Sequence, residues 1–169
     1  MGSPHKQFTF AIDLPVRSEW TNVDVVRNAI LNCFRTVFRD IEGCQRIAMV
    51  AGELMENAIK YGHWAVSEDR PLRLRLGGNG EKIYVSVESP VDPGSPRVKD
   101  LFATLEWLGG FPSAADAFQA RMLAIASAPP GSAGSKLGLA RIAYEGNCRL
   151  AAEIEGDLLR VKSEMQVPL

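Results

Sequence analysis

The chain has 169 residues, of which 46% are hydrophobic and 23% charged, and its formal net charge is −1. A chain of this length builds a core without disulfides or a structural metal, and the composition is typical of a soluble globular domain. The near-neutral charge gives no electrostatic reason to expect a nucleic-acid partner. The chain has no long uncharged apolar run, and its start, MGSPHK, lacks the apolar core of a signal peptide. We therefore expect a cytoplasmic protein without a membrane span.

The first third of the chain predicts one strand and two helices. Residues 8–15 alternate between apolar and polar side chains and end at a proline, which favours a strand. Residues 18–41 have helical periodicity, and Gly43 separates them from a second helix over residues 45–62. Gly62 is expected to end that second helix.

The middle of the chain predicts a β-hairpin followed by two more helices. Leucines and arginines alternate over residues 71–78, and Ile, Val and Val alternate over residues 81–90. The sequence GGNG (77–80) supplies the turn between these strands. Helical segments follow at 97–108 and 114–127, divided by GGFPS.

The last third predicts a loop, a short helix and a second hairpin. Residues 128–138 are rich in Gly, Ser and Pro, residues 137–146 form a short helix, and residues 148–165 form a hairpin around Gly156. Strands joined by hairpins imply a mostly antiparallel mixed sheet with helices on one face. The expected fold is an α/β (α+β) two-layer sandwich in a single domain, 1–169.

The three cysteines are odd in number and form no CxxC motif, and only two histidines are present. This argues against a zinc site and against a histidine-based triad. We interpret Cys33, Cys44 and Cys148 as buried or half-buried thiols of a reducing compartment.

The second predicted helix carries a carboxylate, a carboxamide and a phenol along one edge. Glu53, Asn57 and Tyr61 follow one another at four-residue steps in AGELMENAIKYGH. Arg46, Glu53 and Lys60 recur every seven residues, and that spacing alone is typical of a solvent-exposed helix face. A functional interpretation therefore needs a second element.

A loop near the end of the chain supplies that element. In PPGSAGSKLGLARIA, a Gly/Ser segment with Lys136 opens directly onto a helix. Backbone N–H groups at a helix N-terminus favour anions, and glycines allow phosphate oxygens to approach closely. Such loops are also common as plain linkers, so the signal is weak by itself.

Together, ELMENAIKY and the later GSAGSKLGLARIA resemble the N box and G2 box of the GHKL (Bergerat-fold, histidine-kinase-like) ATPase superfamily. The order of elements resembles that fold over nearly the whole chain. The N box falls in 8–62, an altered G1 box in the hairpin 71–90, the lid and G2 box in 128–146, and a closing hairpin in 148–165. The short chain looks most like the stand-alone anti-sigma-factor and SiaB-type serine/threonine protein kinases.

The resemblance implies roles for particular residues. Glu53 would be the general base for the attacking hydroxyl, Asn57 a ligand of Mg²⁺ bridging the phosphates, and Tyr61 an aromatic neighbour of the nucleotide. The residues expected to form the lid over the phosphates are Gly134, Ser135, Lys136, Leu137 and Gly138.

The G1 box departs from the pattern of the resembling family, Asp-x-Gly-x-Gly, whose aspartate binds the adenine amino group. The position in phase with the strand is Ser89, followed by Pro90. Asp92 and Gly94 provide an aspartate and a glycine at nearly the right spacing, but Asp92 is out of phase with the strand. Loss of a charge-assisted hydrogen bond here costs on the order of 1.5–3 kcal/mol of binding.

The resemblance implies a bacterial regulator that uses ATP and Mg²⁺ to phosphorylate a serine or threonine of a small STAS-like or sigma-factor-related partner protein. Homodimers are common among the resembling kinases. The alternative is a non-catalytic regulator of the same fold that has lost nucleotide binding and sequesters its partner.

Overall fold

The computed structural model describes residues 7–16, 23–66, 69–78, 82–128 and 137–166. In chain order the elements are β1 (Phe8–Pro15), α1 (Val23–Val37), α2 (Ile41–Tyr61), the 3₁₀ helix η1 (Trp64–Val66), β2 (Pro71–Gly78), β3 (Lys82–Pro90), α3 (Pro96–Gly109), α4 (Ala114–Ala126), α5 (Leu137–Glu145), β4 (Cys148–Glu155) and β5 (Leu158–Gln166). None of the helices in these ranges is both long enough and apolar enough to cross a membrane.

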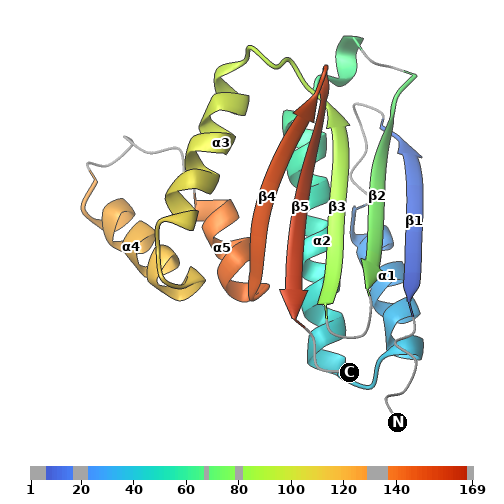
Figure 1. Cartoon of the computed structure of the whole chain (residues 1–169). Helices are drawn as coiled ribbons and strands as arrows, with labels where there is room; N and C mark the ends of the chain where they lie inside the picture. The colour runs from blue at the N-terminus through green and yellow to red at the C-terminus, as the bar shows by residue number, and fades with distance from the viewer. Residues whose placement is uncertain (1–6, 17–22, 67–68, 79–81, 129–136, 167–169) are drawn as a thin grey trace.

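The strands form one five-stranded sheet in the order β1-β2-β3-β5-β4 (Figure 1). Each of these pairings is antiparallel. The two predicted hairpins, β2–β3 and β4–β5, meet where β3 pairs with β5, so that Val87 lies opposite Val161 and Ser89 opposite Leu159. The helices lie on one face of this sheet (Figure 1), which confirms the predicted two-layer class.

The break between the first two helices differs from the prediction. Helix α1 ends at Val37 and α2 begins at Ile41, so Gly43 lies inside the first turn of α2. The chain leaves the helical path at residues 38–40, where Phe38 turns into the core and stacks on Phe34 with ring centroids 5.6 Å apart.

Helix α2 and strand β2 provide the centre of the core. Leu72, Leu74 and Leu76 are buried on β2, as the predicted alternation requires. The buried stripe of α2 includes Ile47 and Leu54. Because this stripe faces the sheet, the opposite edges of α2 are left to contact other helices and solvent.

The predicted burial of the cysteines was right for two of the three thiols. Cys44 and Cys148 are buried, whereas Cys33 is exposed on α1. Burial raises the pKa of Cys148 to about 12, so this thiol is neutral at physiological pH.

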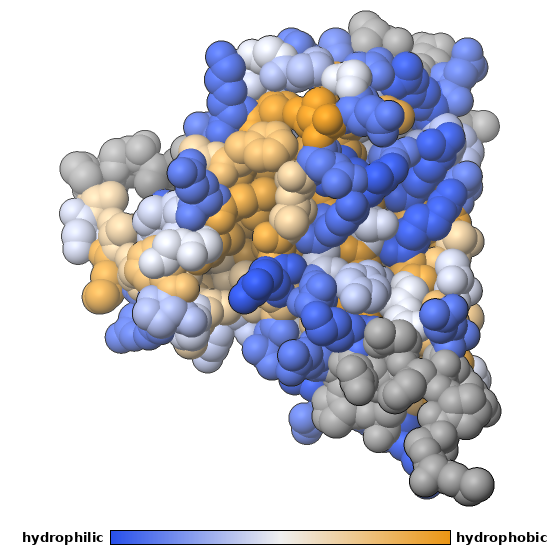
Figure 2. All heavy atoms as spheres, viewed as in Figure 1, coloured by the Kyte–Doolittle hydropathy of each residue, from blue (hydrophilic) through white to orange (hydrophobic). Residues whose placement is uncertain are grey.

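The other face of the sheet carries charged side chains, and no helix among the described residues covers it. Arg73 contacts Glu88 at 2.8 Å, and Arg160 bridges Glu88 and Glu153 at 2.7 and 2.6 Å. Lys162 also contacts Glu153, at 2.7 Å. Figure 2 shows hydrophilic side chains over the middle of this face and hydrophobic ones toward α3 and α4. Paired charges are compatible with contact between this sheet face and water.

Glu88 makes the stability of the sheet pH-dependent. Burial raises the pKa of this carboxyl, but hydrogen bonds from Arg160 and Arg73 outweigh burial, and the pKa lies below its ordinary value of 4.5. A depressed carboxyl pKa stabilises the fold above the unfolded-state value, and that stability is lost as the pH falls through the lower folded-state pKa. Glu88→Gln should therefore lower the free energy of unfolding at pH 7 by about 1–2 kcal/mol and lessen its decline below pH ~4.5. Urea titrations between pH 3 and 7 measure both effects. Glu155→Gln is the control, and equal losses from both variants would contradict the prediction.

Candidate functional site

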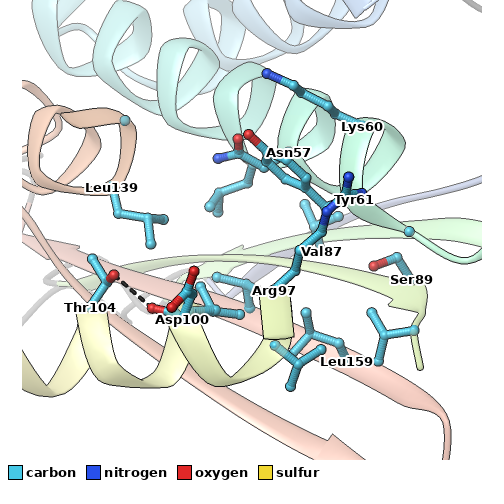
Figure 3. A pocket seen from close by; sticks show the side chains of 18 residues that line it. Asn57, Lys60, Tyr61, Val87, Ser89, Arg97, Asp100, Thr104, Leu139 and Leu159 are labelled. Atoms are coloured by element: carbon cyan, nitrogen blue, oxygen red, sulfur yellow. Dashed lines mark hydrogen bonds between the residues drawn. The ribbon is translucent and has the colours of Figure 1, made fainter. Parts of the chain in front are cut away.

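A cavity of about 610 Å³ lies between α2 and α3, over strands β3 and β5 (Figure 3). Its floor is largely apolar and includes Val87, Leu159 and Val161. The polar side chains that line it are Asn57, Lys60, Tyr61, Ser89, Arg97, Asp100 and Thr104. A concave, mainly apolar site with a few polar groups is typical of a small-molecule site.

Helices α2 and α3 run in opposite directions on either side of the cavity (Figure 1). The last turn of α2 therefore lies beside the start of α3 at one end of the cavity. The start of α3 packs over the ends of β3 and β5, because Val98 clusters with Val91 and Leu159. The last turn of α2 reaches the same end, where the N–H of His63 donates to the carbonyl of Pro90 at 2.7 Å. The start of α5 lies at the opposite end, where Leu139 and Thr104 are found (Figure 3).

We call the end lined by Asn57, Gly138 and Leu139 the phosphate end, and the end lined by Tyr61, Ser89 and Arg97 the base end. These names follow the expectation from the sequence that the protein binds a nucleotide. A helix N-terminus such as that of α5 favours anionic groups. An aromatic ring and an apolar floor favour a flat ring system.

The predicted N-box residues divide between the cavity and the α2–α5 contact. Asn57 and Tyr61 line the cavity. Glu53 lies one turn before Asn57 and is not among the lining residues; its carboxylate accepts a hydrogen bond from Nη2 of Arg141 on α5 at 2.5 Å. The Glu53 side chain is 20% exposed. It is therefore a half-buried, paired carboxylate beside the phosphate end, and not a freely solvated one as the seven-residue spacing alone suggested.

Of the residues predicted for the altered G1 box, the base end contains Ser89 but neither Asp92 nor Gly94. Ser89 is 3% exposed and lies on the cavity floor. Asp92 points into its own turn, where its Oδ1 accepts from the N–H of Gly94 at 3.0 Å. Asp92 and Gly94 are exposed and are not among the lining residues. The strand phase explains this outcome, because only residues in register with Val85 and Val87 face the helices.

Of the five residues predicted to form the lid, the structure describes only the last two, Leu137 and Gly138. Leu137 begins α5 and does not line the cavity, whereas Gly138 does. Among the described residues, no atom outside the turn of Gly138 itself lies within 4 Å of the position where a side chain at Gly138 would begin. Gly134, Ser135 and Lys136 lie outside the described residues.

The contribution of α3 was missed by the sequence analysis. Ser95 caps this helix by accepting from the N–H of Val98 at 3.4 Å, and Pro96 occupies its first turn. Arg97 then lies over the Tyr61 ring, 5.7 Å from the ring centroid, and Lys60 lies 5.2 Å from the same centroid. Two cations therefore stand beside one aromatic ring at the mouth of the cavity. The Ser-Pro start of the helix was the available signal, but it does not reveal which surface the helix covers.

The donor set of the cavity suits a magnesium ion better than a transition metal. Among the described residues, no group of three or more His, Cys, Asp or Glu side chains could hold a metal. Asn57 offers one carboxamide oxygen. Mg²⁺ accepts so few protein ligands because it keeps water molecules and binds phosphate oxygens. A magnesium ion that arrives with a nucleotide therefore fits this site.

No protein-family model and no curated protein matches the sequence. The fold is similar to that of a chain in the crystal structure of the SiaB–SiaC complex from Pseudomonas aeruginosa, with a TM-score of 0.65. The two chains are 14% identical, and the similarity covers 94% of this chain and 89% of the other. At this identity the similarity establishes the fold.

Proposed function

We propose that this protein is a regulatory serine/threonine kinase of the GHKL type that acts on a small partner protein. One observation carries the proposal: Asn57 and the first turn of α5 line the same apolar cavity, although eighty residues separate them in the chain. This supports the proposal, because a residue of the segment that resembles the N box and the described end of the segment that resembles the G2 box line one end of a single cavity.

The phosphoryl donor would be a nucleoside triphosphate, which the resemblance implies is ATP. Its phosphates would lie at the phosphate end, near Asn57 and the N–H groups that begin α5. When bound, Mg²⁺ would neutralise charge on the phosphates, with Asn57 as its protein ligand. Phosphoryl transfer depends mostly on positioning and charge stabilisation, so few protein groups suffice.

Glu53 would take the proton from the attacking hydroxyl. Its Oε1 is held by Arg141, and among the described residues no donor contacts its Oε2. A carboxylate fixed through one oxygen keeps the other in a defined orientation toward a substrate hydroxyl. Arg141 would thus position the base, and it would also couple the base to α5, the helix that begins at the predicted lid.

The partner would be a small regulatory protein. The structural relative is a complex of two named proteins, SiaB and SiaC. The resembling kinases act on STAS-like or sigma-factor-related partners, and we extend that class of partner to this chain.

A second candidate function is favoured by two features of the site. Ser89 stands where the resembling family has an aspartate, and Glu53 is already engaged by Arg141. A non-catalytic regulator that keeps the fold and sequesters its partner would tolerate both changes.

Binding of a nucleotide to the native state separates the two functions. A ligand at a hundred times its Kd stabilises the fold by about 2.7 kcal/mol, which corresponds to a rise in Tm of roughly 5–10 °C for a chain of this size. We expect this rise with ATP plus MgCl₂, measured by differential scanning fluorimetry. Asn57→Ala should remove the dependence on magnesium, whereas Asn28→Ala, at an exposed position on α1, should not. No shift at millimolar nucleotide would favour the non-catalytic regulator.

A further inference from the structure

Strand β1 forms one edge of the sheet, and no other described strand pairs with its outer side. It hydrogen-bonds to β2 alone and is the outermost strand on the side away from α3 and α4 (Figure 1). Its pairing with β2 runs without a bulge over all eight residues, Phe8–Pro15. A long, regular edge strand presents a row of N–H and C=O groups that can pair with a further strand.

The apolar side chains of β1 are covered less completely than those of β2. Phe10, Ile12 and Leu14 are half-buried, whereas the β2 leucines directly opposite them have at most 1% of their surface exposed. The β2 side chains have a neighbouring strand on both sides, and the β1 side chains have one on a single side. A sixth strand at this edge would therefore bury apolar surface, which favours association.

The opposite edge of the sheet, β4, is protected in ways that β1 is not. Strand β4 carries one arginine and two glutamates at exposed positions, and its Ala152 and Ile154 pack against the cluster that includes Val98 of α3. Strand β1 has a single charged residue, Asp13, whose carboxylate is engaged by Arg75 at 2.5 Å. Charged side chains and covering elements are common means by which native proteins prevent edge pairing. Their scarcity on β1 makes it the edge that suits a further strand.

The sequence of β1 is complementary to itself in an antiparallel arrangement. When Ala11 of one copy lies opposite Ala11 of another, residues on the same face of the two strands meet. The apolar residues then form two kinds of cross-strand pair, Phe10 opposite Ile12 and Phe8 opposite Leu14. On the other face, the hydroxyl of Thr9 can donate to the carboxylate of Asp13. No like charges oppose each other in this register.

We propose that the chain forms a homodimer in which β1 pairs antiparallel with β1 of a second copy, joining two five-stranded sheets into one. Such an interface is isologous, because the same strand contributes both halves across a two-fold axis. The self-complementary register favours a second copy over a strand of another protein. The proposal does not rest on nucleotide binding, since the cavity lies over β3 and β5 and not at this edge.

The test measures the oligomeric state by sedimentation equilibrium over a range of protein concentrations. The mass of the wild type should rise from 18.5 kDa to twice that value as the concentration increases. Ala11→Glu should raise the dimer dissociation constant on the order of fivefold or more, because two glutamates would then face each other at the two-fold axis. Within one copy, Ala11 is exposed and lies opposite Arg75, so the fold should tolerate a glutamate there.

Ala151→Glu is the matched control. Ala151 is also an exposed alanine on an edge strand, and it lies opposite a cation, Lys162. Because it lies on β4, the same substitution should leave the dissociation constant unchanged. Circular dichroism melts check that both variants are folded.

Hydrogen exchange of the wild type provides a second measurement that needs no variant. In the dimer, the β1 amides that point away from β2 gain hydrogen-bond acceptors, so their exchange should slow as the protein concentration rises. The amides of β4 should exchange at the same rate at every concentration. Exchange on β1 that does not depend on concentration would contradict the proposal.

The other outcomes assign the surfaces differently. A monomer at every concentration would overturn the homodimer and leave a strand of another protein as the occupant of this edge. A dimer that Ala11→Glu leaves intact, but that Leu123→Asp dissociates, would place the interface on α4, where Leu123 is 62% exposed. Neither result would bear on the kinase function, which the nucleotide titration tests separately.

Discussion

Replacement of Glu53 by glutamine should lower the rate of phosphoryl transfer by about 10²–10⁴-fold while leaving the nucleotide affinity within about twofold. The loss should fall on the chemical step, because glutamine cannot accept the proton of the attacking hydroxyl. Glutamine keeps the size of the side chain and retains an oxygen that can accept from Arg141, which holds the native carboxylate at 2.5 Å. The architecture of the α2–α5 contact should therefore survive.

The rate can be measured before the partner is known, as release of inorganic phosphate with water in place of the substrate hydroxyl. Transfer of ³²P to the partner then repeats the comparison. Glu56→Gln is a matched control on the same helix, since Glu56 is exposed and contacts Arg27 at 3.1 Å, away from the cavity. Equal measurable rates for wild type and Glu53→Gln would remove Glu53 as the base, whereas no activity in either protein would favour the non-catalytic regulator.

Replacement of Ile47 by alanine should lower the free energy of unfolding by about 2–5 kcal/mol. Ile47 has no exposed surface and lies in the central core cluster, between α2 and the sheet. Removing three carbons at such a position loses their transfer free energy and leaves a cavity that the neighbouring side chains fill only partly. The same stripe of α2 sets the position of Asn57, so nucleotide affinity should fall as well.

Chemical denaturation with guanidinium chloride measures this loss as a shift of the midpoint with an unchanged slope. Ile41→Ala provides the control, because Ile41 begins the same helix and is 53% exposed. Its substitution should change stability by less than about 0.5 kcal/mol. Similar losses from both variants would mean that α2 does not pack on the sheet as described.

The period of the apolar residues was sufficient to predict most of the fold. The alternation at Leu72, Leu74 and Leu76 identified β2. The alternation on β3 placed Ser89 on the helical face of that strand, in phase with Val85 and Val87. Hairpin connections then required antiparallel neighbours. The start of α2 was placed four residues too late, because its boundary depends on Phe38 entering an aromatic cluster with Phe34 and Phe8, a tertiary contact without a local signature.

Less of the candidate site than of the fold could be predicted from the sequence. Asn57 and Tyr61 could be assigned to one helix edge from their spacing, since residues four apart share a face. The spacing could not show that Glu53 meets Arg141, because 88 residues separate the two side chains. It also gave no indication that Arg97 would lie over Tyr61.

The sequence by itself determined which residues share a strand face or a helix edge, because those relations depend only on local backbone geometry. It therefore defined the antiparallel two-layer class and the edge of Asn57 and Tyr61. Only the tertiary structure decided what faces that edge: α3 brings Arg97 to one end of the cavity, and α5 brings Arg141 to Glu53 beside the other. The placement of α3 and α5 depends on the burial of side chains distant in the chain, and local periodicity carries no information about it.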